Sequence, residues 1–255
     1  MVTLTPIQLL RDSHSAATVG IIASLTGGAW VLLVWSVWDM DGLAGRLLMP
    51  MGEPWSLGQL LADFGMWTIM MAAMMIPSAT PTVLLFTAME RERAPAAARG
   101  RAAAFIAGYF GVWIAFSAVA TFVQALLHDA AMISPMMTST DRYLSVAILI
   151  ATGLYQWTPL KLVCLRQCRT PLGFLMTQWR EGVRGAANMG MRHGLFCVGC
   201  CWLLMSLLFV AGVMNLIWVA ILTTAVAVEK LLPRGEWLAR GFGVLLIGLG
   251  IATLG

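Results

Sequence analysis

The sequence predicts an all-α fold, a polytopic bundle of transmembrane helices. Three observations predict it: 60% of the 255 residues are hydrophobic, only 11% are charged, and the apolar residues fall in long uninterrupted runs. A soluble domain has roughly 25% charged residues, and a bilayer core about 30 Å thick needs about 20 mainly apolar residues per helix. These runs occupy almost the whole chain, so we expect residues 1–255 to form one integral membrane domain.

About seven spans are predicted, and two of them need comment. The first apolar run, from Val19 to Trp38, is longer than the roughly 7–15 residues of a signal-peptide core and has no cleavage site after it, so it is expected to stay as a helix. Pro77 and Pro81 interrupt the second span, where each removes a backbone hydrogen bond. A kink beside a pathway and a kink of ordinary packing both fit this pattern. The spans lie near residues 19–38, 62–88, 102–127, 143–163, 195–213, 215–232 and 239–255.

Positive charge is distributed very unevenly between the two sides of these spans. Only Arg46 and Arg142, of sixteen Lys and Arg residues, fall on the side opposite the N-terminus. Positive residues collect in cytoplasmic loops, so the N-terminus is predicted to be cytoplasmic. The same bias accounts for the net charge of +4. No basic stripe interleaved with aromatics indicates nucleic-acid binding, and the expected partner is the lipid bilayer.

The two loops expected on the outer face are rich in carboxylates and methionines and include one histidine. Carboxylates and imidazole bind many metal ions, and thioethers suit Cu(I). These loops are therefore candidates for capturing a metal cation. The capture residues are Asp39, Met40 and Asp41 in the first loop and His128, Asp129, Met136 and Met137 in the second.

A methionine stripe runs along the second predicted span. Met66, Met70 and Met74 recur at four-residue intervals and share one helix face. Methionine is also a flexible apolar filler, so ordinary packing explains the stripe as well as metal binding does. Thioether is a soft, uncharged ligand that suits Cu(I). The stripe is thus a candidate route for that ion.

All five cysteines fall in one layer near the predicted cytoplasmic surface. Two end the fourth span and three begin the fifth, with Met205 one helical turn beyond and His193 just before. Thiolate is the form that binds metal, and a helix N-terminus with nearby cations favours it; Cys197 is expected in such a first turn. Adjacent positions in a helix point different ways, so not every cysteine need be a ligand. The candidate ligands are Cys164, Cys168, Cys197, Cys200, Cys201, Met205 and His193.

Several thiolates crowded in a low dielectric repel one another unless a cation binds them. Cu(I), Zn(II) or another thiophilic ion such as mercury would provide that charge. A structural disulfide is less attractive, because the cytoplasm is reducing.

Two further segments lie on the predicted inner side. Glu229 and Lys230 end the sixth span, and we expect this charge pair to reach the lipid headgroups, with a functional role as the alternative. Residues 171–185 form either a loop or an interfacial helix. In the helical case Phe174, Leu175 and Trp179 would face lipid.

Three stretches carry a resemblance to a known family: "MWTIMMAAMMIP", residues 155–175 and residues 194–233. They resemble the bacterial family catalogued as predicted metal-binding integral membrane proteins of unknown function. The resemblance covers the chain roughly from the second span to the sixth. It implies a polytopic fold in the bacterial inner membrane and a metal site at the cysteine positions.

The sequence therefore predicts a membrane protein that binds a soft metal ion, copper(I) first, with zinc or mercury as alternatives. The ion would move inward from the outer loops along the methionines to the cysteines, and another membrane protein or a metallochaperone would be a partner. Two alternatives stay open: an accessory subunit of a larger membrane complex, and a thiol–disulfide redox protein. No catalytic set or ATP-binding motif is recognised.

Overall fold

The chain is helical throughout the part that the computed structural model describes, residues 13–39, 42, 56–133, 139–232 and 234–254. The one β-type contact among these residues is an isolated bridge between Ile133 and Ser139. The all-α prediction is confirmed. In chain order the helices are α2 (Ser13–Trp38), α4 (Leu57–Arg93), α5 (Ala98–Asp129), α6 (Arg142–Tyr155), α7 (Pro159–Arg169), α8 (Pro171–Gln178), α9 (Gly182–Ala211), α10 (Leu216–Leu231) and α11 (Gly235–Ala252).

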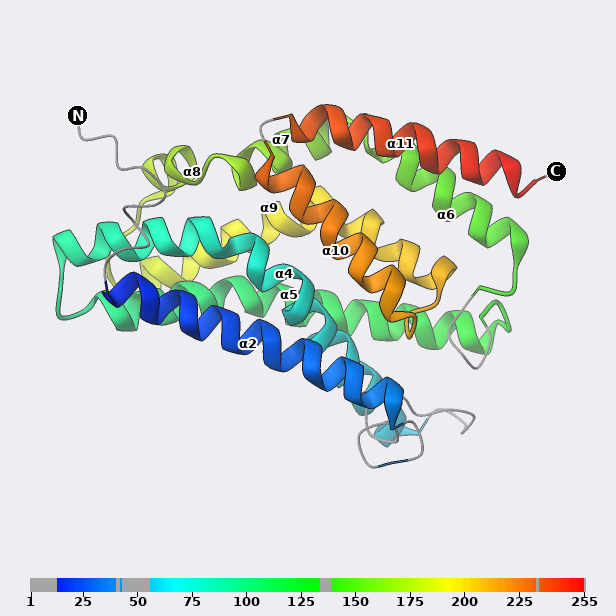
Figure 1. Ribbon diagram of the computed structural model, residues 1–255, viewed down its shortest axis with the longest axis horizontal. Coiled ribbons are helices and arrows are strands. Elements are labelled where there is room, and N and C mark those ends of the chain that lie inside the picture. Colours follow the sequence, from blue (N-terminus) through cyan, green and yellow to red (C-terminus); the bar gives the residue numbers. More distant parts are fainter. Residues whose placement is uncertain (1–12, 40–41, 43–55, 134–138, 233, 255) are drawn as a thin grey trace.

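The helices form two unequal groups, which are joined by the packing of α6 and α7 on α9 and also by α10 (Figure 1). In the larger group, α5 packs against both α4 and α9, and α2 packs on α4. In the smaller group, α6 pairs with α11, while α7 packs on α9. Helix α10 contacts α4, α9, α7 and α11, so it reaches helices of both groups.

Helices α5 and α9 approach so closely that side chains are excluded between them. A Cβ atom added at Gly108 would lie 2.1 Å from the carbonyl oxygen of Ala187, and one added at Gly190 would lie 1.9 Å from that of Phe105. Glycine at both positions lets the two backbones touch, as is common between helices in membranes. This contact fixes the position of α9, and with it the position of three cysteines.

Helix α4 continues through both of its prolines. Ser56 caps its N-terminus by accepting a hydrogen bond from the backbone N–H of Gln59 at 3.2 Å, and the helix bends along its length (Figure 1). Pro77 and Pro81 lie within it and are the expected cause of a bend. Its 37 residues correspond to about 55 Å, more than the roughly 30 Å of a bilayer core.

The number of candidate spans differs from the seven predicted. Among the described residues, five helices are long and apolar enough to cross a membrane, or six if α6 and α7 count as one span. These helices indicate a multi-pass membrane protein. The expected span 215–232 is α10, which has only 16 residues, about 24 Å.

The expected span 143–163 is broken. Helices α6 and α7 meet at an angle of 64°, because Pro159 opens α7 and the residue before a proline resists helical geometry. The hydroxyl of Thr158 caps the new helix by accepting from the backbone N–H of Lys161 at 3.3 Å.

The segment after α7 forms a helix, but Phe174 and Leu175, which were predicted to face lipid, point inward, whereas Leu172 and Met176 are exposed. Phe174 and Leu175 of α8 are fully buried. Phe174 packs against the ring of His193 with centroids 5.0 Å apart, and Trp179 packs against Phe86 at 5.7 Å. The prediction that Phe174 and Leu175 face lipid is therefore wrong, because α8 packs against the C-terminal half of α4 and the N-terminal half of α9.

Candidate metal centre

Four of the five cysteines come together between α7 and α9. Cys168 comes from α7 and Cys197, Cys200 and Cys201 from α9, and all four are buried free thiols. We call these four residues the cysteine cluster. The thiol of Cys168 lies near those of Cys197 and Cys200. The prediction that cysteines from two separate spans share one layer thus agrees with the structure.

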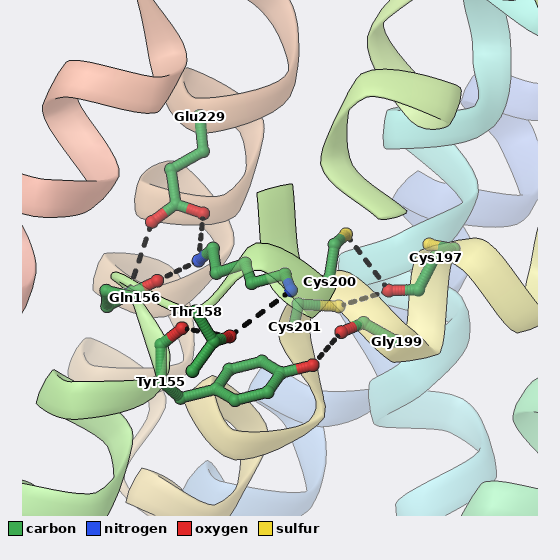
Figure 2. Close-up of polar contacts among 9 residues, drawn as sticks. Tyr155, Gln156, Thr158, Cys197, Gly199, Cys200, Cys201 and Glu229 are labelled. Carbon is green, nitrogen blue, oxygen red and sulfur yellow. Dashed lines mark hydrogen bonds and ion pairs between the residues drawn. The ribbon is translucent and has the colours of Figure 1, made fainter. Parts of the chain in front are cut away.

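Within α9 the thiols turn back onto their own helix. Figure 2 shows the Cys200 and Cys201 thiols directed at the carbonyl oxygen of Cys197, to which they donate at 3.1 and 2.9 Å. Both adjacent cysteines therefore reach the same backbone atom, although neighbouring helical positions point in different directions.

The remaining two candidate sulfur ligands lie at the margin of the cluster. Cys164, one turn before Cys168 in α7, packs against Gly199, where an added Cβ atom would lie 2.7 Å from its sulfur. Met205 is fully buried and lines a cavity of about 150 Å³ together with Trp67 and Phe209. That cavity places Met205 beside the methionine-bearing helix α4.

A buried lysine supplies positive charge to the cluster. The ammonium nitrogen of Lys230, on α10, lies 2.9 Å from the sulfur of Cys197 and 3.2 Å from the hydroxyl of Ser78 on α4. Its side chain is 6% exposed. The expectation that Lys230 reaches the headgroups is wrong, because α4 and α9 enclose the C-terminal end of α10.

Tyr109 of α5 completes the contacts around Cys197. Its hydroxyl lies 3.1 Å from the Cys197 sulfur and 2.9 Å from the carbonyl oxygen of Met75, to which it donates. Side chains from α4, α5, α7, α9 and α10 thus meet within this one buried site.

His193 stands one helical turn before Cys197 in a cage of aromatic rings. Its ring centroid lies 5.6 Å from that of Tyr109, and the side chain is 2% exposed. Its Nδ1 atom has no hydrogen-bond partner. A buried, unpartnered imidazole nitrogen near thiols is a donor that a soft metal can use.

The helix that carries these residues starts earlier than predicted. Because α9 begins at Gly182, Cys197 lies about four turns inside it and not in its first turn. The helix N-terminus therefore contributes nothing to thiolate formation at Cys197. The nearby positive charge comes from Lys230.

A second buried polar cluster lies on the other face of α10. Lys161 donates to Glu229 at 2.7 Å and also to Gln156, which itself donates to Glu229 at 3.4 Å (Figure 2). Tyr155 donates to the carbonyl oxygen of Gly199. These bonds tie the break between α6 and α7 to α9 and α10, directly behind the cysteine cluster. Glu229 is thus buried, and its expected contact with headgroups is also wrong.

The candidate residues of the outer side lie apart from this centre. Met66, Met70 and Met74 are buried along α4, whereas Asp39 follows α2 and His128 and Asp129 end α5. Helix α4 links the two sets, because its Ser78 contacts Lys230 and the carbonyl oxygen of its Met75 accepts from Tyr109. Four predicted capture residues lie outside the described part of the chain: Met40, Asp41, Met136 and Met137.

The donor types fit a soft metal, but their present rotamers do not enclose one. In the described part of the chain, no group of three or more His, Cys, Asp or Glu side chains is arranged to hold a metal ion. Two thiols bond to the Cys197 carbonyl, and the Lys230 ammonium lies against the Cys197 sulfur. Metal binding would require those thiols to rotate.

Comparison with known proteins adds independent information. Residues 64–253 match the model of the PpoB2 family, whose description is copper chaperone. The chain belongs to this family. The match runs from α4 to α11 and includes every cysteine, so the PpoB2 assignment supports copper as the relevant metal. No curated protein and no solved structure matches the chain.

Sequence reasoning missed several residues that the structure brings into the site or its surroundings. Lys161 could have been found from the sequence, because it is an ionisable residue within a predicted span and such residues are functional candidates. Tyr109 gave no signal of its own, since a tyrosine in an apolar span is common. Its contact with Cys197 depends on how α5 packs on α9.

Proposed function

We propose that this protein is a membrane copper chaperone that holds Cu(I) in the cysteine cluster. The observation that carries the proposal is the meeting of four buried free thiols from α7 and α9 in a chain of a copper chaperone family. Cu(I) prefers thiolate ligands, and the unpartnered His193 nitrogen offers a further donor.

The charge of the site suits a monovalent ion. When two thiols release their protons and bind Cu⁺, the complex carries one negative charge. A buried anion needs a compensating cation, and the Lys230 ammonium beside Cys197 supplies it. With Zn²⁺ two thiolates would already be neutral, and the ammonium would be left uncompensated. The arrangement therefore favours Cu(I) over zinc.

The delivery route in this proposal follows α4 inward. The outer-loop carboxylates, His128 and methionines gather the ion, and the buried thioethers of Met66, Met70 and Met74 accept it in turn. Ser78 ends this path and contacts Lys230. Ligand softness rises from carboxylate to thioether to thiolate, which favours movement toward the cysteines. A metallochaperone or another membrane protein would then receive the ion.

A competition titration tests the cysteine site. The protein is purified in detergent without oxygen and titrated with Cu(I) against a coloured chelator. Wild type is expected to bind Cu(I) at the cluster, and Cys168→Ser/Cys197→Ser/Cys200→Ser is expected to lose that site. Cys164→Ser, which removes a buried thiol outside the cluster, is the control and should retain it. Unchanged Cu(I) affinity in the triple variant would overturn the proposal and favour an accessory structural role.

A further inference from the structure

A buried carboxylate without a partner lies far from the cysteine cluster, near the start of α4. The side chain of Asp63 has no exposed surface, and neither of its oxygen atoms has a hydrogen-bond partner. Burying an unpaired carboxylate in an apolar environment costs much free energy. Such a group in a membrane-spanning helix therefore calls for a counter-ion or a proton.

The residues that follow Asp63 supply the rest of a binding site. Met66, Met70 and Met74 come three, seven and eleven positions later, so they share its helix face, and all three are buried. The neighbouring polar side chain of Gln124 is already occupied, because it accepts from the indole N–H of Trp67 at 2.7 Å. On its own face of α4, the Asp63 carboxylate therefore has methionine sulfur atoms as neighbours and no other charged side chain.

Charge arithmetic identifies the class of ligand. Thioethers are neutral, so a monovalent soft cation held by methionines keeps its full positive charge in a low dielectric. One carboxylate beside it makes the site neutral. A divalent ion would leave one excess positive charge, and a hard ion such as Mg²⁺ would not be bound by thioethers.

We propose that Asp63, Met66 and Met70 form a second metal site, specific for a monovalent soft cation such as Cu⁺ or Ag⁺. The site lies about 22 Å along α4 from Ser78, the residue of this helix that contacts Lys230 beside the cysteine cluster. Met74 lies between the site and Ser78. Binding at Asp63 is independent of the cysteines. Its role as the first buried stop on the inward route rests on the proposed function.

The decisive experiment removes every thiol first. In a variant with all five cysteines replaced by serine, calorimetric titration with Ag⁺, which does not change oxidation state under these conditions, is expected to detect one remaining site. Adding Asp63→Asn, which keeps the shape and removes the charge, should weaken that site by about a hundredfold or more, since breaking a buried charge pair costs several kcal/mol. Glu92→Gln, at an exposed carboxylate near the other end of α4, is the matched control and should leave binding unchanged.

The outcomes separate the two proposals. Ag⁺ binding unaffected by Asp63→Asn would overturn the second site and leave the cysteine cluster untouched. Loss of all Ag⁺ binding in the variant without cysteines would also overturn the second site. If the Asp63 site binds Ag⁺ but the cysteine cluster binds no metal, only the first proposal is overturned. If Asp63→Asn does not fold, methyl NMR of the wild-type methionines decides. Ag⁺ should shift the signals of Met66 and Met70, and unmoved signals would refute the site.

Discussion

The ammonium nitrogen of Lys230 lies 2.9 Å from the sulfur of Cys197, and both side chains are buried. The residue before it, Glu229, faces the opposite way and pairs with Lys161 at 2.7 Å. That second pair is neutral as a whole. Of these three charged side chains, Lys230 therefore supplies the net positive charge, and its ammonium group lies next to the Cys197 thiol.

Replacing Lys230 by methionine is expected to weaken Cu(I) binding at the cysteine cluster by about tenfold or more, because an anionic copper–thiolate complex would lose its buried counter-ion. The methionine side chain is of similar length, so packing changes little. Competition titration measures the effect. Arg234→Met removes an exposed positive charge four residues further along and should have no effect. Equal affinity in both variants would contradict a role for Lys230.

The Lys161–Glu229 pair should matter for stability. Glu229→Gln leaves the buried Lys161 ammonium without its partner, and breaking such a pair costs about 3–5 kcal/mol. Thermal unfolding in detergent should show a clear drop in melting temperature. Lys161→Met/Glu229→Leu, which removes both charges, should recover most of it.

An exposed ion pair serves as the control for that measurement. Arg166 and Glu236 lie 3.0 Å apart, but the Arg166 side chain is 65% exposed. Surface pairs contribute little, so Glu236→Gln should leave the melting temperature nearly unchanged. A Glu229→Gln variant as stable as Glu236→Gln would show that the buried pair is not needed for the fold.

Much of this molecule follows from local sequence, and the exceptions have a common cause. Apolar run length predicted most of the helices, and the positions of the cysteines at the ends of two spans predicted their shared layer. The break before Pro159 was readable from the proline itself. In contrast, the burial of Lys230 depends on α4 and α9 covering the end of α10, which no pattern within 215–232 records.

The same distinction applies to the ligand set. Sequence spacing placed Met205 one helical turn beyond the three cysteines of α9, but it did not reveal that the thiols bond to a backbone carbonyl. The spacing also did not show that Cys168 belongs to the cluster and Cys164 does not, since the two residues lie four positions apart on the same helix face. That separation comes from α9, which presents Gly199 to one cysteine and thiols to the other.

Copper should protect Cys168 from a small thiol reagent and leave Cys164 reactive. The two residues form a matched pair, because they lie one turn apart on α7 and each is 8% exposed. The reactivity of each thiol is compared with its own value in the metal-free protein, so that the change reports on bound metal. Cys168 contacts the other thiols of the cluster, so a Cu(I) ion there would hold its sulfur, whereas Cys164 faces Gly199. Mass spectrometry of the labelled protein, with and without one equivalent of Cu(I), measures both sites in one sample. Equal protection of the two would extend the copper site to Cys164, and protection of neither would place the ion elsewhere.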